Sequence, residues 1–266
     1  MTSDITEALH SVALFGDIVR PLLVAALLIG LWNGLGRAGR NKTARVLSWT
    51  WIAVILVAWL STVWTLSVRG VIATVADSGV YGAVIRILLP IILLSSGAMI
   101  LMTRSQTMTA VIDATPLWWL VSFQAYRITG FLFLRLWAKG FLPGYFALPA
   151  GVGDMLTGAF AIGAGIALLQ QARWARSFAY AVNIFGLLDL ANAVSMGILT
   201  AANSTTGPSP LLVYPLSMVP TFGVPLAVIV HCLSLWQLKR RSHGSTGNSR
   251  AHRDHAPDFE MNEARS

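Results

Sequence analysis

Four ionisable side chains interrupt long apolar runs of this sequence, and they are the residues best placed to do chemistry. They are Arg127, Asp154, Asp189 and His231, each in a different apolar run. An ionisable group in the hydrocarbon layer of a membrane costs several kcal/mol, so each of the four is a functional hypothesis that needs a named partner. Arginine does not give up its proton in proteins, and Arg127 therefore requires a carboxylate or a water-filled cavity.

Arg127, Asp154 and Asp189 come to nearly the same depth when each apolar run is drawn as a spanning helix. We expect Arg127 to pair with at least one of the two carboxylates. Gln124 precedes Arg127 by three residues and shares its helix face, and Asn192 follows Asp189 at the same spacing. Both amides are predicted to extend the network. One arginine against two aspartates leaves a carboxylate over, which could hold a proton as proton-coupled carriers require.

His231 is the one histidine within the apolar runs. A lone histidine there is more typical of a core side chain bonded to a backbone carbonyl than of a ligand, and haem or zinc would need further ligands. No metal, cofactor or catalytic residue is therefore predicted. The candidate binding residues are Gln124, Arg127, Asp154, Asp189, Asn192 and His231.

The same cluster supports two interpretations, which the sequence leaves open. In the first, the cluster binds or transports a small polar or anionic solute, or a lipid headgroup, through Arg127, while a spare aspartate carries a proton. In the second, the ion pairs only fix helix packing. The protein would then be a membrane scaffold or an accessory subunit without transport activity.

An enzymatic interpretation comes third. Gly151-Val-Gly-Asp154 matches the GxGD signature of intramembrane aspartyl proteases and prepilin peptidases, in which two carboxylates share a proton. In those families the other catalytic aspartate precedes the motif. Here the earlier candidate, Asp113, falls in a predicted loop, and Asp189 follows the motif instead. The match is therefore weak, and no HExxH motif or membrane-embedded lysine suggests another enzyme class.

The composition requires a membrane to position these residues. Apolar residues make up 55% of the 266 residues and charged residues only 11%, against roughly 25% in soluble domains. This excludes a soluble nucleic-acid binder, a disordered chain and a disulfide scaffold, since Cys232 is the single cysteine. We predict an all-α polytopic protein whose first partner is the lipid bilayer; its oligomeric state is left open.

Seven apolar stretches are long enough to span a bilayer, with six as the alternative count. They are 16–36, 46–68, 81–102, 117–138, 146–169, 177–200 and a last one ending at Leu238. As one helix, the run 211–238 would be about 42 Å long, which exceeds the hydrocarbon thickness of about 30 Å. It also contains three prolines, so an irregular or kinked start is predicted at 211–221.

Lysine and arginine gather in the loops after the first, third and fifth stretches and directly after Leu238. By the positive-inside rule this predicts an outer N-terminus and a cytoplasmic C-terminus. Residues 1–238 form the transmembrane domain. The polar segment 239–266 is predicted to be a disordered cytoplasmic tail. Glycine and alanine crowd the stretch 146–169, which predicts a central helix in close contact with its neighbours.

Three motifs carry a resemblance to a family of uncharacterised bacterial polytopic membrane proteins. They are Gln124-Ala-Tyr-Arg127, Gly140-Phe-Leu-Pro143 and the GxGD sequence ending at Asp154. The resemblance implies a multi-pass protein of the bacterial plasma (inner) membrane. It implies no activity and no catalytic residue.

Overall fold

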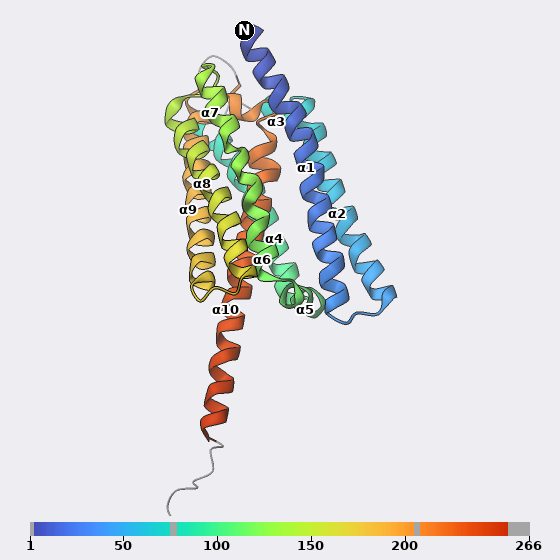
Figure 1. Ribbon diagram of the computed structural model, residues 1–266. Helices are drawn as coiled ribbons and strands as arrows, with labels where there is room; N and C mark the ends of the chain where they lie inside the picture. Colours follow the sequence, from blue (N-terminus) through green and yellow to red (C-terminus); the bar gives the residue numbers. More distant parts are fainter. Residues whose placement is uncertain (1–2, 75–78, 205–207, 255–266) are drawn as a thin grey trace, which may run out of the picture.

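The computed structural model describes residues 3–74, 79–204 and 208–254, and these residues form helices and no strand. Six of the helices are long and apolar enough to cross a membrane. The six are α1 (Ser3–Arg37), α2 (Lys42–Val68), α4 (Gly79–Arg104), α8 (Gly144–Leu169), α9 (Ala175–Ala202) and α10 (Val224–Asp254). Figure 1 shows them side by side, running between two ends of one bundle.

The predicted span 117–138 is helical throughout but is built in three pieces. These are α6 (Leu117–Ser122), the 3₁₀ helix η2 (Phe123–Gly130) and α7 (Phe131–Ala138). The backbone keeps right-handed helical angles at both junctions, so the pieces form one continuous helix. In Figure 1 this helix rises from the end of the bundle near α5 to the opposite end, although each piece alone is too short to count as a span.

Shorter helices lie at the two ends of the bundle. The helix α5 (Gln106–Ala114) lies at the lower end in Figure 1, and α3 (Val71–Thr74) lies near the upper end. The loop predicted around Asp113 is therefore wrong, because Asp113 belongs to the last turn of α5. The side chain of Ser105 caps this helix by accepting a hydrogen bond from the backbone of Met108 at 3.3 Å.

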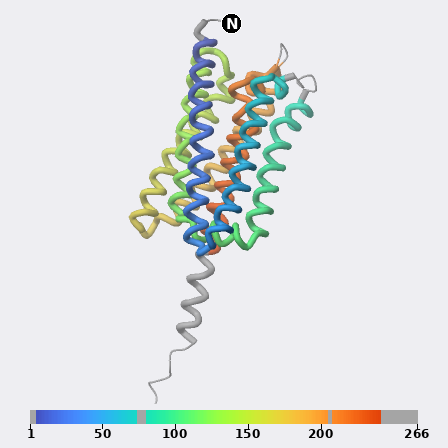
Figure 2. Tube along the Cα trace, turned by 90° about the vertical axis from the view of Figure 1, so that its right-hand side faces the viewer, coloured from blue at the N-terminus to red at the C-terminus, as the bar shows by residue number. Residues whose placement is uncertain are grey.

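The first helix is longer than its apolar core predicted, since α1 begins at Ser3 and not near residue 16. The added turns are held by packing. Ala8 and Val12 are buried in a cluster with Phe133 and Leu136. Figure 2 shows α1 running along the length of the bundle, and Figure 1 shows α10 leaving the bundle at the end opposite the N-terminus.

The last apolar run has the irregular start that its prolines predict. A 3₁₀ turn, η3 (Pro210–Leu212), is followed by the π-helix η4 (Val219–Gly223), which leads into α10. Pro225 has no N–H to donate to the carbonyl of Thr221. The indole Nε1 of Trp59 donates to that carbonyl at 3.2 Å instead, so α2 satisfies a backbone group that α10 leaves open.

Helix α10 continues to Asp254, past Leu238, where the composition predicts that the ordered domain ends. Residues 255–266 of the predicted tail lie outside the described part of the chain. For those residues the predicted disorder stays a prediction.

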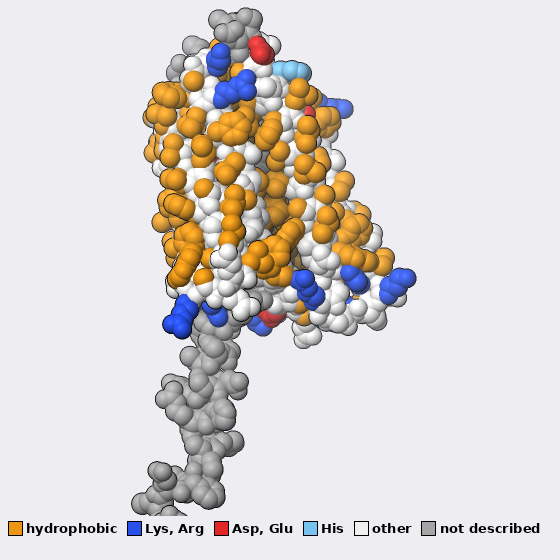
Figure 3. All heavy atoms as spheres, viewed as in Figure 1, with side chains coloured by type: hydrophobic (Ala, Val, Ile, Leu, Met, Phe, Trp, Pro, Cys, Tyr) orange, Lys and Arg blue, Asp and Glu red, His pale blue; other side chains and the backbone are white. Residues whose placement is uncertain are grey.

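The helix at the centre of the bundle is α10, and not α8 as the small residues predicted. Most of its membrane window is buried, whereas about a third of the α8 window is. α8 does pack against α6, η2, α7 and α9, but its opposite face is exposed at Val152 and Phe160. Figure 3 shows apolar side chains over the flank of the bundle, with lysine and arginine at its two ends, as expected of a surface that faces lipid.

Candidate functional site

Arg127 joins both predicted carboxylates. Its Nε donates to Oδ1 of Asp154 at 2.6 Å, and its Nη2 donates to Oδ2 of Asp189. The arginine side chain is 2% exposed, and the aspartate side chains are 20% and 6% exposed respectively. The predicted pairing is therefore present with both partners, and the guanidinium lies between helices α8 and α9.

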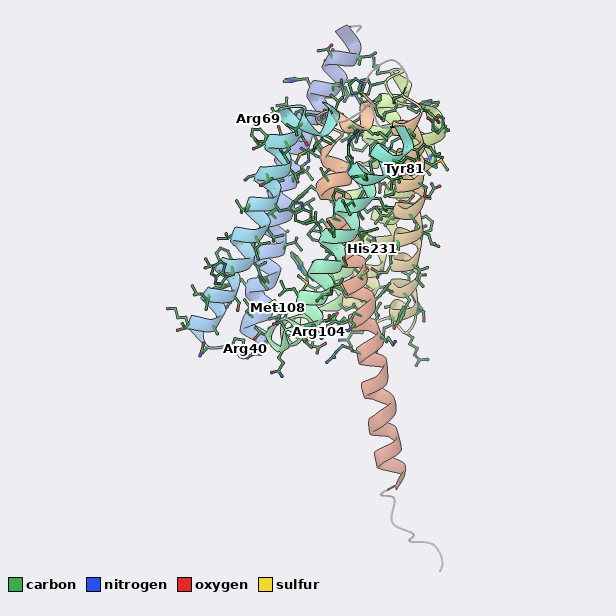
Figure 4. The ribbon with its side chains drawn as sticks, turned by 180° about the vertical axis from the view of Figure 1, so that it is seen from behind. Arg40, Arg69, Tyr81, Arg104, Met108 and His231 are labelled. Atoms are coloured by element: carbon green, nitrogen blue, oxygen red, sulfur yellow. The ribbon has the colours of Figure 1, made fainter. Side chains whose placement is uncertain are left out.

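The two Nη1 donors of Arg127 reach a carbonyl and an imidazole. Nη1 donates to the backbone oxygen of Gly186 at 3.1 Å and lies 3.2 Å from Nε2 of His231. An arginine can only donate, so Nε2 must be the unprotonated nitrogen of a neutral imidazole. His231 is fully buried and lies in the middle of the bundle, between Arg104 at one end and Tyr81 at the other (Figure 4).

The other ring nitrogen of His231 continues the chain of hydrogen bonds. Nδ1 must carry the proton, and it donates to Oδ1 of Asn183 at 2.9 Å. The amide nitrogen of Asn183 donates in turn to the carbonyl of Ala179 at 2.7 Å. Four helical segments, η2, α8, α9 and α10, thus meet in one network, which fixes the tautomer of the histidine.

The 3₁₀ geometry of η2 explains how Arg127 is aimed inward. Side chains three residues apart lie in line along a 3₁₀ helix, whereas they diverge along an α-helix. Gln124, Arg127 and Gly130 are all buried, and the same three-residue spacing continues to Phe133 and Leu136. Eight residues is long for a 3₁₀ helix, and such stretches inside longer helices often mark functional hinges.

Glycines make room for the network. A Cβ added at Gly153 would meet Oδ1 of Asp189 at 1.7 Å, and one at Gly186 would meet the ring of His231 at 2.5 Å. A Cβ at Gly130 would come within 2.5 Å of the Cβ of Asp154. Any larger residue at these three positions would push a member of the network away from Arg127.

A second set of glycines lies on α8 at seven-residue spacing. They are Gly151, Gly158 and Gly165, and they face the continuous helix α6–η2–α7. At Gly158 an added Cβ would lie 2.5 Å from the backbone nitrogen of Ile128. The two backbones therefore approach as closely as small residues allow in membrane helix pairs.

The two amides of the predicted cluster are placed differently from the expectation. Gln124 is buried, but its Nε2 donates to the carbonyl of Ala227 at 3.0 Å and so ties η2 to α10. Asn192 is exposed on the outer face of α9. Three residues are 60° short of a full helical turn, and Asp189 already lies at the edge of the buried face, so this offset carries Asn192 outside it.

Asn183 and Gly186 are the members of the network that sequence reasoning missed. Both precede Asp189, toward the middle of the buried face of α9, whereas the predicted partner Asn192 follows Asp189. Asn183 is fully buried. An asparagine six residues before a membrane aspartate is the signal that could have identified it.

A cavity of about 130 Å³ lies beside the network. Its walls come from α1, η2, α7, α8, η4 and the first turn of α10, with Leu190 of α9 and residues between 215 and 218, and most of the lining is apolar. Polar side chains contribute at a few places, namely Arg20, Tyr126, Arg127, Thr129 and Asp154. A smaller cavity of about 50 Å³ also has Asp154 in its wall, whereas Asp189 lines neither of the two.

Arg20 is held at this cavity by groups of its own. Its Nη1 donates to Asp17 at 3.1 Å, and its Nη2 donates to the carbonyl of Pro215 at 3.3 Å. The hydroxyl of Tyr214 donates to the other oxygen of Asp17 at 2.6 Å. Burial and this contact with Asp17 raise the pKa of Tyr214, which keeps the phenol protonated as the donor.

The arrangement does not resemble an aspartyl protease dyad or a metal site. Asp154 and Asp189 bind different nitrogens of Arg127, so a permanent cation separates the carboxylates that a dyad would bring together. Among the residues that the structure describes, no group of three or more histidine, cysteine or acidic side chains could hold a metal ion.

Comparison with known proteins places the chain in a family without a known activity. No curated protein and no solved structure matches it. A family described as a domain of unknown function (DUF8737) matches residues 83–239, more than half of the chain. The matched residues include the whole Arg127 network and begin after α2. The chain therefore belongs to the DUF8737 family.

Proposed function

We propose that this protein is a seven-span membrane protein that binds or transports a small polar solute at Asp154. The observation that carries the proposal is that the two oxygens of the Asp154 carboxylate differ in their hydrogen bonds. Oδ1 of Asp154 accepts from Arg127, while among the described residues no donor contacts Oδ2. The side chain is 20% exposed, and it lines both cavities. One oxygen is thus fixed and the other is available to a ligand.

Two non-α segments support this assignment. The 3₁₀ helix η2 and the π-helix η4 both line the larger cavity, and the hydroxyl of Tyr126 joins them by donating to the carbonyl of Gly223 at 3.3 Å. In membrane proteins irregular backbone is tolerated where it is buried in protein or lines a cavity. Many transporters place their solute sites at such interrupted helices.

Arg127 is less suited to be the group that contacts the solute. Four of its five N–H groups are taken up by Asp154, Asp189, Gly186 and His231. An anionic solute bound through Arg127 would have to displace one of these acceptors. In the proposal Arg127 positions Asp154, and Asp189 balances Arg127.

The proposed topology has seven crossings, with an outer N-terminus and a cytoplasmic C-terminus. The seventh crossing is the helix α6–η2–α7, which joins the same two ends of the bundle as the six longer helices (Figure 1). The basic loops after α1, α4 and α8 would then share the cytoplasmic side with the end of the α10 span. The resemblance to bacterial proteins supports a location in the bacterial plasma membrane.

A scaffold or accessory role is the second candidate, and the pairing of four of the five Arg127 N–H groups favours it. A buried arginine with its donors satisfied can hold helices together without any ligand. The scaffold explains Asp189 and His231 as well as the binding proposal does. It gives no account of the carboxylate oxygen of Asp154 that no described donor contacts, at a residue that lines two cavities.

Native mass spectrometry of the full chain separates the two roles. Asp154→Asn keeps the shape of the side chain and an oxygen for Arg127, but removes the charge at the cavity. Asp189→Asn is the matched control, because it removes the same charge from the same network away from the cavity. We expect a co-purifying small molecule on the wild type and on Asp189→Asn that is lost from Asp154→Asn. Equal spectra for all three proteins would contradict the binding role.

A further inference from the structure

The charges around Arg127 do not balance. With both carboxylates ionised, Asp154 and Asp189 carry two negative charges against the single positive charge of the arginine. His231 contributes none, because its Nε2 accepts from Arg127 and its ring is therefore neutral. Arg20 does not make up the difference, since it is paired with Asp17. With both carboxylates ionised the site is one positive charge short, and either a proton on one carboxylate or a cationic ligand would supply that charge.

An unbalanced charge within a membrane protein is costly, and a cationic partner would relieve it. Asp154 is where that partner can be reached, because it lines both cavities and Asp189 lines neither. Asp154 lies about 15 Å along α8 from Gly144, at 1.5 Å per residue, and so well inside the bundle.

The lining of the cavity distinguishes between kinds of cation. A metal ion would need several oxygen ligands, and the described residues offer no such group. The walls instead provide four aromatic side chains, Phe15, Tyr126, Phe133 and Phe222. Aromatic faces together with a carboxylate are the groups that recognise organic ammonium ions.

We infer that the cavity takes a small organic ammonium ion, whose charged nitrogen binds Oδ2 of Asp154 and whose apolar part lies among the aromatic side chains. This inference rests on the proposed function and specifies the class of its solute. The sequence suggests an anion bound at Arg127, whereas the charge distribution favours a cation bound at Asp154.

Thermal unfolding and calorimetry of the full chain in detergent test the inference with defined probes. The ammonium probes are methylammonium, tetramethylammonium and benzylammonium, and their counterparts are benzyl alcohol and benzoate. We expect at least one ammonium probe to raise the Tm of the wild type, and to raise it less in Asp189→Asn, because that variant removes one of the two negative charges that Arg127 faces. Asp154→Asn should bind that probe about tenfold more weakly or worse, since hydrogen bonds to charged groups are worth that much. The alcohol and the carboxylate should have no such effect.

A steric pair of variants provides a readout that does not depend on charge. Gly223 lies in the cavity wall, and a Cβ there would meet nothing within 4 Å, so Gly223→Leu should fill the cavity and abolish binding of the ammonium probe. Gly97 is equally open but lies on the exposed face of α4, so Gly97→Leu should bind as the wild type does.

The outcomes for the inference and for the proposed function can be told apart. Binding of benzoate in preference to benzylammonium, or no response to any ammonium probe, would overturn the ammonium inference. The proposed function would survive either result if native mass spectrometry still found a molecule that Asp154→Asn loses. Undiminished binding of the ammonium probe by Asp154→Asn would overturn the placement of the charge.

Discussion

Arg127 and Asp154 share one hydrogen bond, from Nε to Oδ1 at 2.6 Å, and within the described residues no donor contacts the second oxygen of this cavity-lining carboxylate. The contact fixes the orientation of the Asp154 carboxylate and uses only one of its two oxygens. Asp189 makes the complementary contact with Nη2 from a position away from both cavities. Two chemically identical side chains therefore have different surroundings.

Replacing Arg127 by leucine should be far more destabilising alone than together with its partners. The single variant leaves two carboxylates buried without a counter-charge, and breaking a buried pair in this way costs roughly 3–5 kcal/mol. The triple variant with Asp154→Asn and Asp189→Asn removes those charges and should recover most of the loss. Thermal unfolding in detergent measures both. A single variant as stable as the wild type would show that the ion pairs contribute nothing to the fold.

Gly158→Ala should weaken the packing between α8 and η2. Its Cβ would lie 2.5 Å from the backbone nitrogen of Ile128, so the two backbones must separate, at a cost of about 1–3 kcal/mol. Gly163→Ala on the same helix is the control, since its nearest neighbour is the ring of Phe178 at 3.5 Å. Comparison of the two unfolding temperatures is the measurement, and equal temperatures would refute the close approach.

Asn183 and His231 should be energetically coupled. Asn183→Leu leaves the Nδ1–H of the buried imidazole without an acceptor, which costs about 1–3 kcal/mol. After His231→Leu the same change at Asn183 should cost less, because that donor no longer exists. A double-mutant cycle of unfolding free energies would then show a coupling of about 0.5–3 kcal/mol. Additive losses would mean that the hydrogen bond between them does not stabilise the protein.

The crossing formed by α6, η2 and α7 can be tested by labelling with an impermeant thiol reagent. In a Cys232→Ser background, Arg104→Cys and Tyr145→Cys flank this helix, and both parent side chains are exposed. We expect the two cysteines to react from opposite sides of the membrane, with Arg104→Cys on the cytoplasmic side. Arg173→Cys, which follows α8, should react from the same side as Arg104→Cys. Labelling of Arg104→Cys and Tyr145→Cys from one side would favour six spans.

The helical membrane class and the pairing of Arg127 with aspartate follow from the sequence, because the alternatives to each have a large free-energy cost. A chain with 11% charged residues cannot cover itself in water, and a buried arginine must find a carboxylate. The depth of Asp154 and Asp189 along their helices was enough to identify them as its partners.

Other features depend on how the helices are rotated and packed against one another, which a regular helical period does not predict. The sequence predicts that Asn192 shares the buried face with Asp189. In the structure the buried face continues from Asp189 toward the residues before it, Gly186 and Asn183. The role of His231 as an acceptor could not be predicted, since it depends on how α10 is rotated after the π-helix η4. The cavity was also missed, because its wall includes α1, which is far away in the sequence.

The 3₁₀ helix η2 also sets the length and the rotation of the helix that contains it. Its eight residues extend about 16 Å at about 2.0 Å per residue, where an α-helix of eight would extend about 12 Å. The whole helix from Leu117 to Ala138 therefore reaches about 37 Å in place of about 33 Å, beyond a hydrocarbon layer of about 30 Å. One residue deleted from η2 would turn α7 through about 120° relative to α6, and would move Phe133 and Leu136 out of their buried cluster with Ala8 and Val12.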